Sequence, residues 1–490
     1  MPSRLGQAAP NAALGAALAV FAALAWSWRG YTPDDTFIFL RYAANAADGR
    51  GLVFNPGERV QGYTSALWTL ILAAAAIAGV PLLACAKAAG VALGAGCLVI
   101  AQAIARRIDA RAAIAAPLVL AGFIDLPYWS VSGMDAALFA FLVAGAMLLT
   151  LRARDGDGPA IAAAIAWGVA GVARPEGAAF GAIALLWLAR ASDERRIPAW
   201  PWIAFIAPIA AWAAFAWMYY GDPPPNTYWA KRFDRVESFR RGLVILRAFS
   251  ANNDGVFIAA AVALAVVLRR HAAVVLSLWL LAFYGAYLLW SGGDSWVSPN
   301  ALRFAVPVLV PVSVAMAAGF SGLIGAIPAG APWRIAAVAA GLVLAAWLVP
   351  PAGSLITRPV GGDPAVIAHL QANAAPGDRL AVTDIGNFAY WTDLPVIDTF
   401  GLVDRHVARS FRKRTNSSYA DGEDLKLVDY VMARAPRWII LKGTSGPGGL
   451  AIADETGAPA IFADARFRRD YRFVIAGTRE PYLLFERTAR

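Results

Sequence analysis

The chain has 490 residues, of which 59% are hydrophobic and only 16% are charged, and its formal net charge at pH 7 is +10. Its mean hydropathy is +0.55, whereas soluble globular chains are roughly 45–50% apolar and about 25% charged. This composition excludes a soluble enzyme, a disordered scaffold and a coiled coil, and it indicates a multi-pass membrane protein. The basic excess then fits the arginines and lysines of cytoplasmic loops, not a nucleic-acid-binding surface.

Apolar runs divide the first 350 residues into candidate membrane spans. A bilayer core of roughly 30 Å needs about 20 apolar residues per helix. Eleven runs approach this length, at 11–28, 83–104, 112–128, 134–151, 159–173, 177–190, 199–219, 255–268, 272–290, 303–325 and 333–349. The further run 64–79 is interpreted as an interfacial or re-entrant helix, because only then do the basic clusters lie on one side of the membrane.

This topology predicts eleven crossings in a bacterial inner membrane, with the N-terminus in the cytoplasm. The C-terminus then lies outside. Beyond residue 351 the composition becomes mixed and charged. Strand-like runs at 379–383, 437–441, 472–476 and 482–486 alternate with helical patterns at 363–374 and 422–434. We therefore expect a transmembrane domain over 1–351, with a catalytic external loop at 29–63, and an extracytoplasmic α/β domain over 352–490.

Ionisable residues are almost missing from the centres of the predicted spans and gather at their external ends. A proton-coupled or secondary transporter is expected to carry such groups near the middle of the membrane. The distribution therefore places the chemistry at the outer membrane surface.

The first external loop begins with two adjacent carboxylates, Asp34 and Asp35. From Asp35 onward the apolar residues Phe37, Leu40 and Ala44 recur at helical spacing, which predicts an amphipathic helix in the membrane interface. The two aspartates would lie at the N-terminus of this helix. Because aspartate is also a frequent helix cap, a structural role stands beside a chemical one.

Several short motifs follow in chain order. The first loop carries Asp34-Asp35, Arg41-Tyr42, Asn45, the run Phe-Asn-Pro-Gly-Glu-Arg-Val at 54–60, and Gly62-Tyr63-Thr64. Downstream come Ser132-Gly133-Met134-Asp135, Arg174-Pro-Glu176-Gly177, Pro225-Asn226-Thr227-Tyr228 with Lys231, Gly292-Gly293-Asp294, Arg303-Phe304, Asp384-Ile-Gly386 and Asp398-Thr-Phe-Gly401-Leu402. In order and spacing they resemble the GT-C membrane glycosyltransferases similar to the mycobacterial terminal arabinofuranosyltransferase, with Asp135 where that family more usually has Glu.

The resemblance implies transfer of a sugar, D-arabinofuranose, from a polyprenyl-phosphate donor to an acceptor hydroxyl at the outer face. A phosphate leaves without protonation while a hydroxyl benefits from a base, so one carboxylate is enough. Asp34 is the first candidate for that base, with Asp35 as its partner or as a metal ligand. Donor phosphate-binding candidates are Lys231, Arg303, Arg232 and Arg174. Substrate-binding candidates are Arg41, Asn45, Asn55, Glu58, Tyr63, Asp135, Glu176, Asn226, Tyr228 and Asp294.

Alternatives remain open at this point. No organic cofactor is expected, and a divalent ion held by Asp34, Asp35 and Asp135 is one alternative for the metal. The partners predicted are the prenyl-phosphate donor, a glycan or glycoconjugate acceptor and the membrane, without nucleic acid. The same chemistry with mannose or aminoarabinose is a second hypothesis, and a lipid-linked sugar flippase or a non-catalytic assembly protein is a third.

Overall fold

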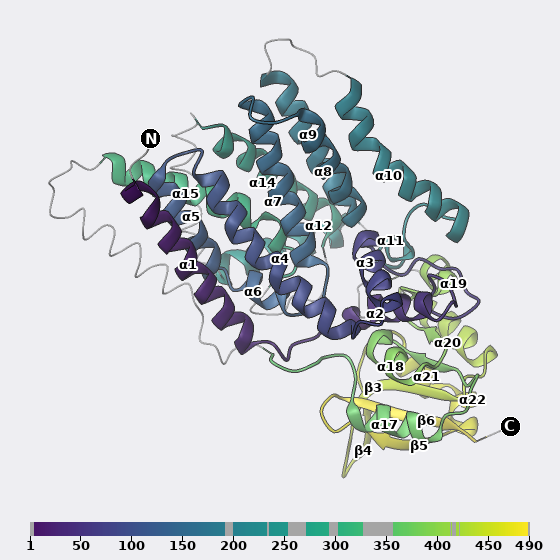
Figure 1. Ribbon diagram of the computed structural model, residues 1–490. Helices are drawn as coiled ribbons and strands as arrows, with labels where there is room; N and C mark the ends of the chain where they lie inside the picture. Colours follow the sequence, from purple (N-terminus) through teal and green to yellow (C-terminus); the bar gives the residue numbers. More distant parts are fainter. Residues whose placement is uncertain are drawn as a thin grey trace. The chain divides into compact units, whose positions relative to one another are not determined.

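The computed structural model describes residues 4–191, 199–232, 235–252, 271–293, 302–326, 356–411, 413, 418–420 and 422–488. The chain forms two compact units, each built from three segments. Unit 1 comprises Met1–Tyr31, Ala86–Trp212 and Ser238–Arg358, and unit 2 comprises Thr32–Cys85, Ala213–Glu237 and Pro359–Arg490. Figure 1 labels the elements of both units.

Unit 1 is helical throughout its described residues. Its helices are α1 (Arg4–Ser27), α4 (Leu82–Ala105), α5 (Ala110–Gly122), α6 (Asp125–Ser130), α7 (Ala136–Arg154), α8 (Ala160–Ala173), α9 (Pro175–Ala191), α10 (Ala199–Tyr220), α12 (Arg235–Asn252), α14 (Ala272–Ser291), the short 3₁₀ helix η1 (Val306–Val308) and α15 (Leu309–Ala326). α4 and α12 begin in unit 2, and α10 ends there. The helix pairs α7 with α8, α1 with α5, and α8 with α9 pack along their lengths.

Small residues bring these helices close together, as is usual for membrane helices. A Cβ on Gly168 of α8 would lie 2.5 Å from the carbonyl oxygen of Phe205 on α10. A Cβ on Gly90 of α4 would lie 2.2 Å from the carbonyl oxygen of Ser130. Both contacts require glycine, so the spacing of the helices is set by the backbone itself.

Six of the described helices are long and apolar enough to cross a membrane. They cover Ala8–Ser27, Leu82–Ala105, Ala136–Arg154, Ala199–Tyr220, Ala272–Ser291 and Val306–Gly325. Shorter apolar helices cover Ala66–Ile77, Ala110–Gly122 and Ala160–Ala173. The chain is therefore a multi-pass membrane protein, while the predicted spans 255–268 and 333–349 lie outside the described residues.

One predicted span is wrong, because it consists of two helices and not one. The sequence predicts a single helix over 112–128, but α5 ends at Gly122 and the six-residue α6 begins at Asp125. Asp125 is fully buried, and its carboxylate accepts a hydrogen bond from the backbone N–H of Leu302. A buried carboxylate needs such a partner, and the N–H of Leu302 supplies it.

Unit 2 combines three short helices from the first 350 residues with the C-terminal domain. The three are α2 (Asp34–Ala47), α3 (Ala66–Ile77) and α11 (Asn226–Ala230). The domain contains α17 (Pro364–Asn373), β1 (Leu380–Val382), α18 (Ile385–Thr392), β2 (Val396–Asp398), α19 (Arg405–Ser410), α20 (Glu423–Ala433), β3 (Trp438–Gly446), β4 (Gly449–Ile452), α21 (Ala458–Ala463), α22 (Ala465–Asp470), β5 (Tyr471–Ala476) and β6 (Tyr482–Arg487).

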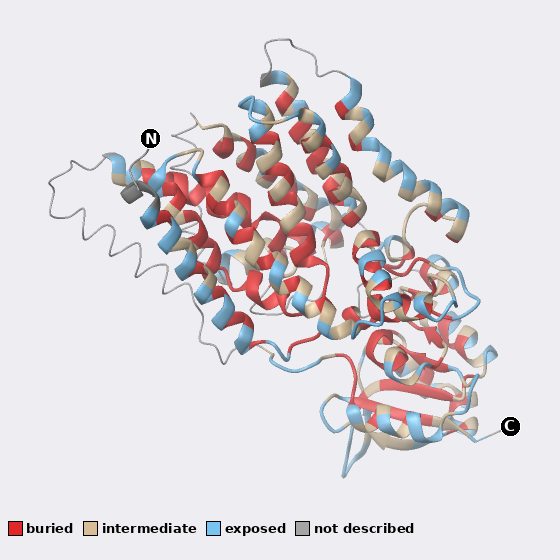
Figure 2. Cartoon of the chain, in the orientation of Figure 1, coloured by how far each residue is buried: buried red, intermediate tan, exposed pale blue. Residues whose placement is uncertain are grey.

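The domain is organised around one six-stranded sheet of order β2-β1-β3-β6-β5, with β4 paired to β3. β1 pairs in parallel with β2 and with β3, whereas β6 runs antiparallel to both β3 and β5. β1, α18 and β2 thus form a parallel crossover unit. Strands β3 and β6 are buried along most of their length, as Figure 2 shows.

The four predicted strands and the two predicted helices of this domain are confirmed. Strand β2 and the β3–β4 hairpin were not predicted. The amphipathic helix of the first loop is confirmed as α2, and α3 is only 12 residues long, shorter than a spanning helix. The first loop packs in the same unit as residues 359–490, and the domain boundary at 352 stays a prediction.

Candidate functional site on the first-loop helix

Asp34 begins α2 and is bound by the backbone of α18. Its Oδ2 accepts a hydrogen bond from the N–H of Gly386 at 2.9 Å, and its Oδ1 accepts one from the N–H of Asn387 at 2.7 Å. These amides belong to the first turn of α18, where a helix has unpaired N–H groups and a partial positive charge. The carboxylate of Asp34 therefore acts as a cap for α18, although it lies 352 positions before Gly386 in the chain.

Asp384 lies directly before α18 but does not cap it. Its carboxylate instead pairs with Lys442 at 3.1 Å and accepts a hydrogen bond from the hydroxyl of Tyr482. Lys442 also pairs with Glu455 at 2.9 Å. Burial alone lowers the pKa of Lys442, but Asp384 and Glu455 outweigh it, and the net pKa is raised.

Burial is the largest influence on the pKa of Asp34 and raises it well above the ordinary value. Repulsion from the carboxylate of Asp384 raises it further, while the amides of Asn387 and Gly386 favour the ionised form and act in the opposite direction. Asp34 thus belongs to a group of carboxylates and one lysine near the carboxyl end of β1.

Arg41 binds the other end of α18. Its guanidinium donates to the carbonyl oxygens of Ala389 and Leu394, the latter at 3.0 Å, and to the carboxylate of Asp393 at 3.3 Å. Its Nε donates to the carbonyl oxygen of Phe54 at 2.9 Å. Burial lowers the pKa of Arg41 to about 10. Arg41, which the sequence predicts to bind substrate, therefore binds backbone carbonyl groups in the structure.

Other predicted site residues of the first loop also bind backbone. Asn45 donates to the carbonyl oxygens of Val53 and Phe54, both at 2.9 Å. Asn55 pairs with Val396 at the edge of β2 through two hydrogen bonds of 2.9 and 3.0 Å. The exposed Glu58 accepts a hydrogen bond from the amide of Asn55 at 3.0 Å.

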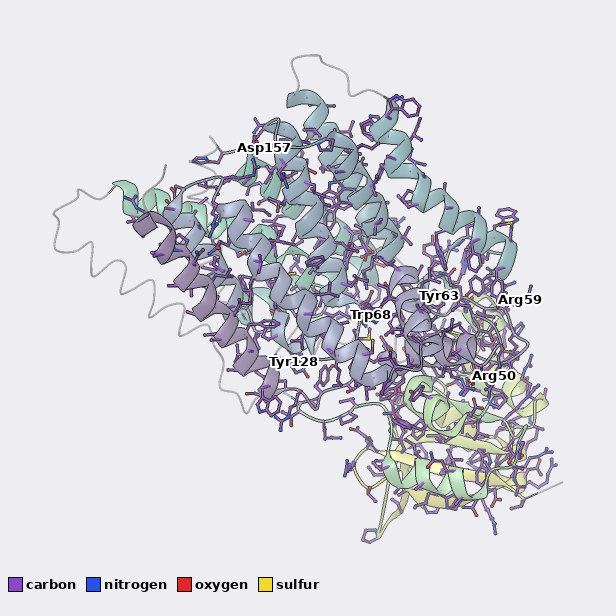
Figure 3. All side chains as sticks on the ribbon, in the orientation of Figure 1. Arg50, Arg59, Tyr63, Trp68, Tyr128 and Asp157 are labelled. Atoms are coloured by element: carbon purple, nitrogen blue, oxygen red, sulfur yellow. The ribbon has the colours of Figure 1, made fainter. Side chains whose placement is uncertain are left out.

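Tyr63 is buried and shares a hydrogen bond of 2.8 Å with the hydroxyl of Tyr220. Figure 3 labels Tyr63 with Arg50 and Arg59, which lie on the same segment between α2 and α3. Burial raises the pKa of the Tyr63 phenol well above its ordinary value. This tyrosine is therefore neutral and holds the loop against the end of α10.

The Pro-Asn-Thr motif lies on α11. Asn226 is buried and donates to the carbonyl oxygens of Gly401 and Leu402 at 2.8 and 3.2 Å. Tyr228 is 54% exposed and stacks edge-on against Trp229. Lys231 follows the helix and is half-buried, while Arg232 is exposed. The ring of Tyr228 is thus accessible to a ligand, whereas Asn226 is occupied by backbone.

The fully buried Asp398 and the half-buried Lys413 both lie near α11. Asp398 accepts hydrogen bonds from the N–H groups of Phe400, Gly401 and Val403 at 2.8, 2.9 and 2.9 Å. Burial raises the pKa of Asp398 to about 6 and lowers that of Lys413 to about 7. Lys413 donates to the carbonyl oxygens of Ala230 and Phe400.

The remaining predicted residues belong to unit 1 and converge at the break between α8 and α9. Arg174 pairs with Asp135 at 3.1 Å and with Glu176 at 3.2 Å. Both carboxylates are almost fully buried, and in the described part of the chain Asp135 Oδ1 and Glu176 Oε2 have no hydrogen-bond partner. The ring of Phe304 lies 5.5 Å from the guanidinium of Arg174 and 5.6 Å from that of Arg303.

The structure thus brings together Asp135, Arg174, Glu176 and Arg303 in unit 1, and Asp34, Asp35, Arg41, Asn45 and Asn55 in unit 2. Asp294 lies outside the described residues. Sequence reasoning missed Lys442 and Lys413, which have no local motif around them. It noted Asp384 only as part of an Asp-x-Gly motif. It did not connect Gly386 of that motif with Asp34, because the two residues lie 352 positions apart in the chain.

The carboxylates do not fit the metal site considered from the sequence. Within the ranges that the structure describes, no three His, Cys, Asp or Glu side chains meet in an arrangement that could hold a metal ion. Asp135 is paired with Arg174 in unit 1, and both oxygens of Asp34 accept backbone hydrogen bonds in unit 2.

Comparison by sequence finds a match for the C-terminal domain. A family model described as a domain of unknown function (DUF8728) matches residues 358–485, the C-terminal domain alone. A comparison with curated proteins found no match.

Comparison by structure covers the whole chain. ArnT from Cupriavidus metallidurans bound to undecaprenyl phosphate matches with a TM-score of 0.61 at 13% identity, covering 99% of this chain and 98% of that one. The Archaeoglobus fulgidus oligosaccharyltransferase matches in its complex with zinc and sulfate with a TM-score of 0.59 at 12% identity, covering 95% and 79%. The same enzyme tethered to an acceptor peptide containing the NVT sequon matches with a TM-score of 0.52 at 12% identity, covering 96% and 79%. The chain therefore has the GT-C fold of integral membrane glycosyltransferases, with a strand-containing C-terminal domain.

Proposed function

We propose that this protein is an integral-membrane glycosyltransferase that moves a sugar from a polyprenyl-phosphate donor to an acceptor hydroxyl at the outer face of the membrane. The observation that carries the proposal is the structural likeness, over nearly the full chain, to an enzyme bound to undecaprenyl phosphate. The pair of carboxylates at the start of α2 supports it, because a base is the group that this reaction needs. The sequence motifs favour D-arabinofuranose as the sugar.

In the proposed reaction, the acceptor oxygen forms a bond to the anomeric carbon while the bond from that carbon to the phosphate oxygen breaks. The electron pair of the broken bond leaves with the polyprenyl phosphate. The proton of the acceptor hydroxyl passes to a carboxylate at the start of α2. Atoms and charge balance without a cofactor.

The leaving phosphate needs cations near the membrane surface. In unit 1 the cation that we assign to it is Arg303, and in unit 2 the alternative is Lys231, with Arg232 beside it in the chain. Arg174 is already paired with two carboxylates, so it contributes to the phosphate site mainly by holding Asp135 and Glu176. Tyr228, which is largely exposed, is the aromatic residue that we assign to the sugar.

We further propose an inner-membrane location with the N-terminus in the cytoplasm and residues 352–490 on the periplasmic side. The excess of arginine in the loops that would then face the cytoplasm supports this orientation. It places α2 and the C-terminal domain on the side where a polyprenyl-linked sugar would be presented.

The test is transfer by purified full-length protein in lipid nanodiscs. Synthetic prenyl-phosphate donors carrying radiolabelled arabinofuranose, mannose or aminoarabinose are each incubated with an alkyl glycan acceptor. We expect transfer from the arabinofuranose donor, and loss of transfer when both Asp34 and Asp35 are replaced by Ala. Transfer from another donor alone would correct the sugar, and no transfer from any of them, with movement of the donor across the bilayer instead, would favour a flippase.

A further inference from the structure

We infer that Lys442 is a positioning residue for the proposed transfer: by holding Asp384, it keeps the N-terminus of α18 for the carboxylate of Asp34. The inference rests on the proposed function, in which a carboxylate at the start of α2 receives the proton of the acceptor. Lys442 lies on β3 and acts through Asp384, without contact with substrate. The argument starts from two carboxylates that can bind the same two amides.

Either Asp384 or Asp34 can cap α18. Asp384 stands at the N-cap position of this helix, from which an aspartate side chain normally accepts hydrogen bonds from the second or third N–H group. In α18 these N–H groups belong to Gly386 and Asn387, and both donate to Asp34 instead, at 2.9 and 2.7 Å. The two aspartates therefore compete for one helix N-terminus, and Asp34 occupies it.

The sheet binds the side chain of Asp384. Lys442 and Tyr482 lie directly opposite each other in the antiparallel pair of β3 and β6. Both bind the same atom, Asp384 Oδ2, the ammonium of Lys442 at 3.1 Å and the hydroxyl of Tyr482 as a hydrogen-bond donor. The ring of Tyr482 also packs edge-on against Phe388 of α18, with ring centroids 5.1 Å apart. These two donors therefore hold the Asp384 carboxylate while the amides of its own helix bind Asp34.

Lys442 also supplies the charge that this arrangement needs. Burial is the main cause that raises the pKa of Asp34, and repulsion from Asp384 raises it further, so the two carboxylates are close enough to disfavour each other. Burial lowers the pKa of Lys442, but its ion pairs with Asp384 and Glu455 outweigh burial and keep the lysine charged. Without Lys442, Asp384 would lose its cation and the amides of α18 would be its nearest source of positive charge.

The start of α2 fits closely against α18, so a change of cap would move it. A Cβ on Gly361 would lie 2.2 Å from the Cβ of Asp34, and a Cβ on Gly386 would lie 2.1 Å from the carbonyl oxygen of Asp34. Figure 1 shows α2 and α18 as neighbouring helices, in agreement with their packing. Because α2 begins at Asp34, displacing this side chain from the amides would shift the carboxylates that the proposed reaction uses.

The experiment compares Lys442→Met, Asp384→Ala, the double variant Lys442→Met with Asp384→Ala, and Tyr482→Phe, in the full-length protein in nanodiscs. Lys426→Met is the matched control, because it removes a lysine of the same domain that forms an ion pair on α20 and whose side chain is 63% exposed. For each protein we measure kcat and KM with the prenyl-phosphate arabinofuranose donor, the Tm, and the hydrogen exchange of residues 34–47.

We expect Lys442→Met to lower kcat at least about tenfold, because a small displacement of a reacting group is costly, while KM for the donor is unchanged. Residues 34–47 should exchange faster in this variant. Asp384→Ala should resemble wild type, since Asp34 keeps the amides. The double variant should regain the kcat of Asp384→Ala, because no competing carboxylate remains. Lys426→Met should resemble wild type in all four measurements.

The rescue decides between this role and a general contribution of Lys442 to the sheet. A double variant as slow as Lys442→Met, or a Lys442→Met protein as active as wild type, would overturn the inference. If Lys442→Met does not fold, Tyr482→Phe replaces it, alone and combined with Asp384→Ala. A loss of kcat that Asp384→Ala restores would then support the inference, and a loss that it does not restore, or no loss, would overturn it.

Failure of the proposed function gives a different result. If wild type transfers none of the donor sugars, the proposed function falls, and the competition for α18 is judged from hydrogen exchange alone. Faster exchange of residues 34–47 in Lys442→Met, reversed in the double variant, would show that Lys442 keeps the N-terminus of α18 for Asp34. Unchanged exchange would overturn this role as well.

Discussion

Asp34 and Arg41, seven residues apart on α2, bind opposite ends of α18 through Gly386 and Asp393, which are also seven residues apart. Seven helical residues span about 10 Å, so the two helices lie side by side in the same direction. The carboxylate meets the N-terminus of α18 and the guanidinium meets its C-terminus, as the dipole of that helix favours. The charge pattern of one helix therefore matches the termini of the other.

Replacing Arg41 by Lys should destabilise the protein although the positive charge is kept. An ammonium group cannot reach the carbonyl oxygens of Phe54, Ala389 and Leu394 together, because it lacks the planar fork of a guanidinium. We expect a loss of about 2 kcal/mol, measured by thermal or denaturant unfolding in nanodiscs. Arg50→Lys, at the exposed pair with Asp393, is the control and should cost less than about 1 kcal/mol. Equal effects of the two substitutions would contradict this account of Arg41.

Gly386→Ala should disturb the first loop from the side of the C-terminal domain. The added methyl would lie 2.1 Å from the carbonyl oxygen of Asp34, so one helix must move. We expect a lower Tm and at least a tenfold loss of transfer. Gly448→Ala is the control, because a Cβ there meets nothing within 4 Å, and it should leave both quantities unchanged. An active Gly386→Ala with a normal Tm would show that the contact between the two helices is dispensable.

Arg174 should matter for stability even before any donor binds. Arg174→Met leaves Asp135 and Glu176 buried without their cation, and we expect this to cost about 4 kcal/mol. The triple variant Arg174→Met, Asp135→Asn and Glu176→Gln removes all three charges and should regain most of that loss. Unfolding in nanodiscs measures both. A triple variant as unstable as the single one would mean that the charges do not act as one group.

The carboxyl of Asp398 should make stability depend on pH. Because burial raises its pKa in the folded protein to about 6, the folded state keeps a proton between about pH 4 and 6 that the unfolded chain has released. Its contribution to stability is therefore full below about pH 4 and is lost as the pH rises towards 6. Two pKa units correspond to on the order of 3 kcal/mol.

The measurement is the difference in Tm between wild type and Asp398→Asn at pH 7 and at pH 5. We expect wild type to gain stability relative to the variant at pH 5. Lys413 interacts with the same carboxyl and has a pKa of about 7, so the comparison is repeated with Lys413→Met in both proteins. An equal difference at the two pH values would show that Asp398 stays ionised throughout.

Local patterns explain which parts of the fold could be predicted. The helix that begins at Asp34 shows its helical periodicity within a few residues, and β3 and β6 show continuous apolar runs of similar length. The partner of Asp125 at the interruption could not be predicted in this way, because the amide of Leu302 lies far along the chain.

In the candidate site, too, local sequence predicts which residues matter but not which distant groups they contact. Sequence reasoning singled out Arg41, Asn45, Asn55 and Asn226 as polar residues in motifs, and all four bind backbone carbonyls or amides. A side chain that binds a ligand and one that binds distant backbone have the same local signature. Asp34 and the Asp-x-Gly motif at 384–386 were both noted, but nothing in the sequence joins them.

The pairing of Asn55 with Val396 has a consequence for the C-terminal domain as a separate molecule. β2 is an outer strand of the sheet, and outer strands offer free N–H and C=O groups to other chains. The amide of Asn55 occupies both groups of Val396, so the first loop shields part of this edge. A fragment of residues 359–490 would present that edge, together with the uncapped start of α18, to its own copies and should associate in a concentration-dependent manner in solution.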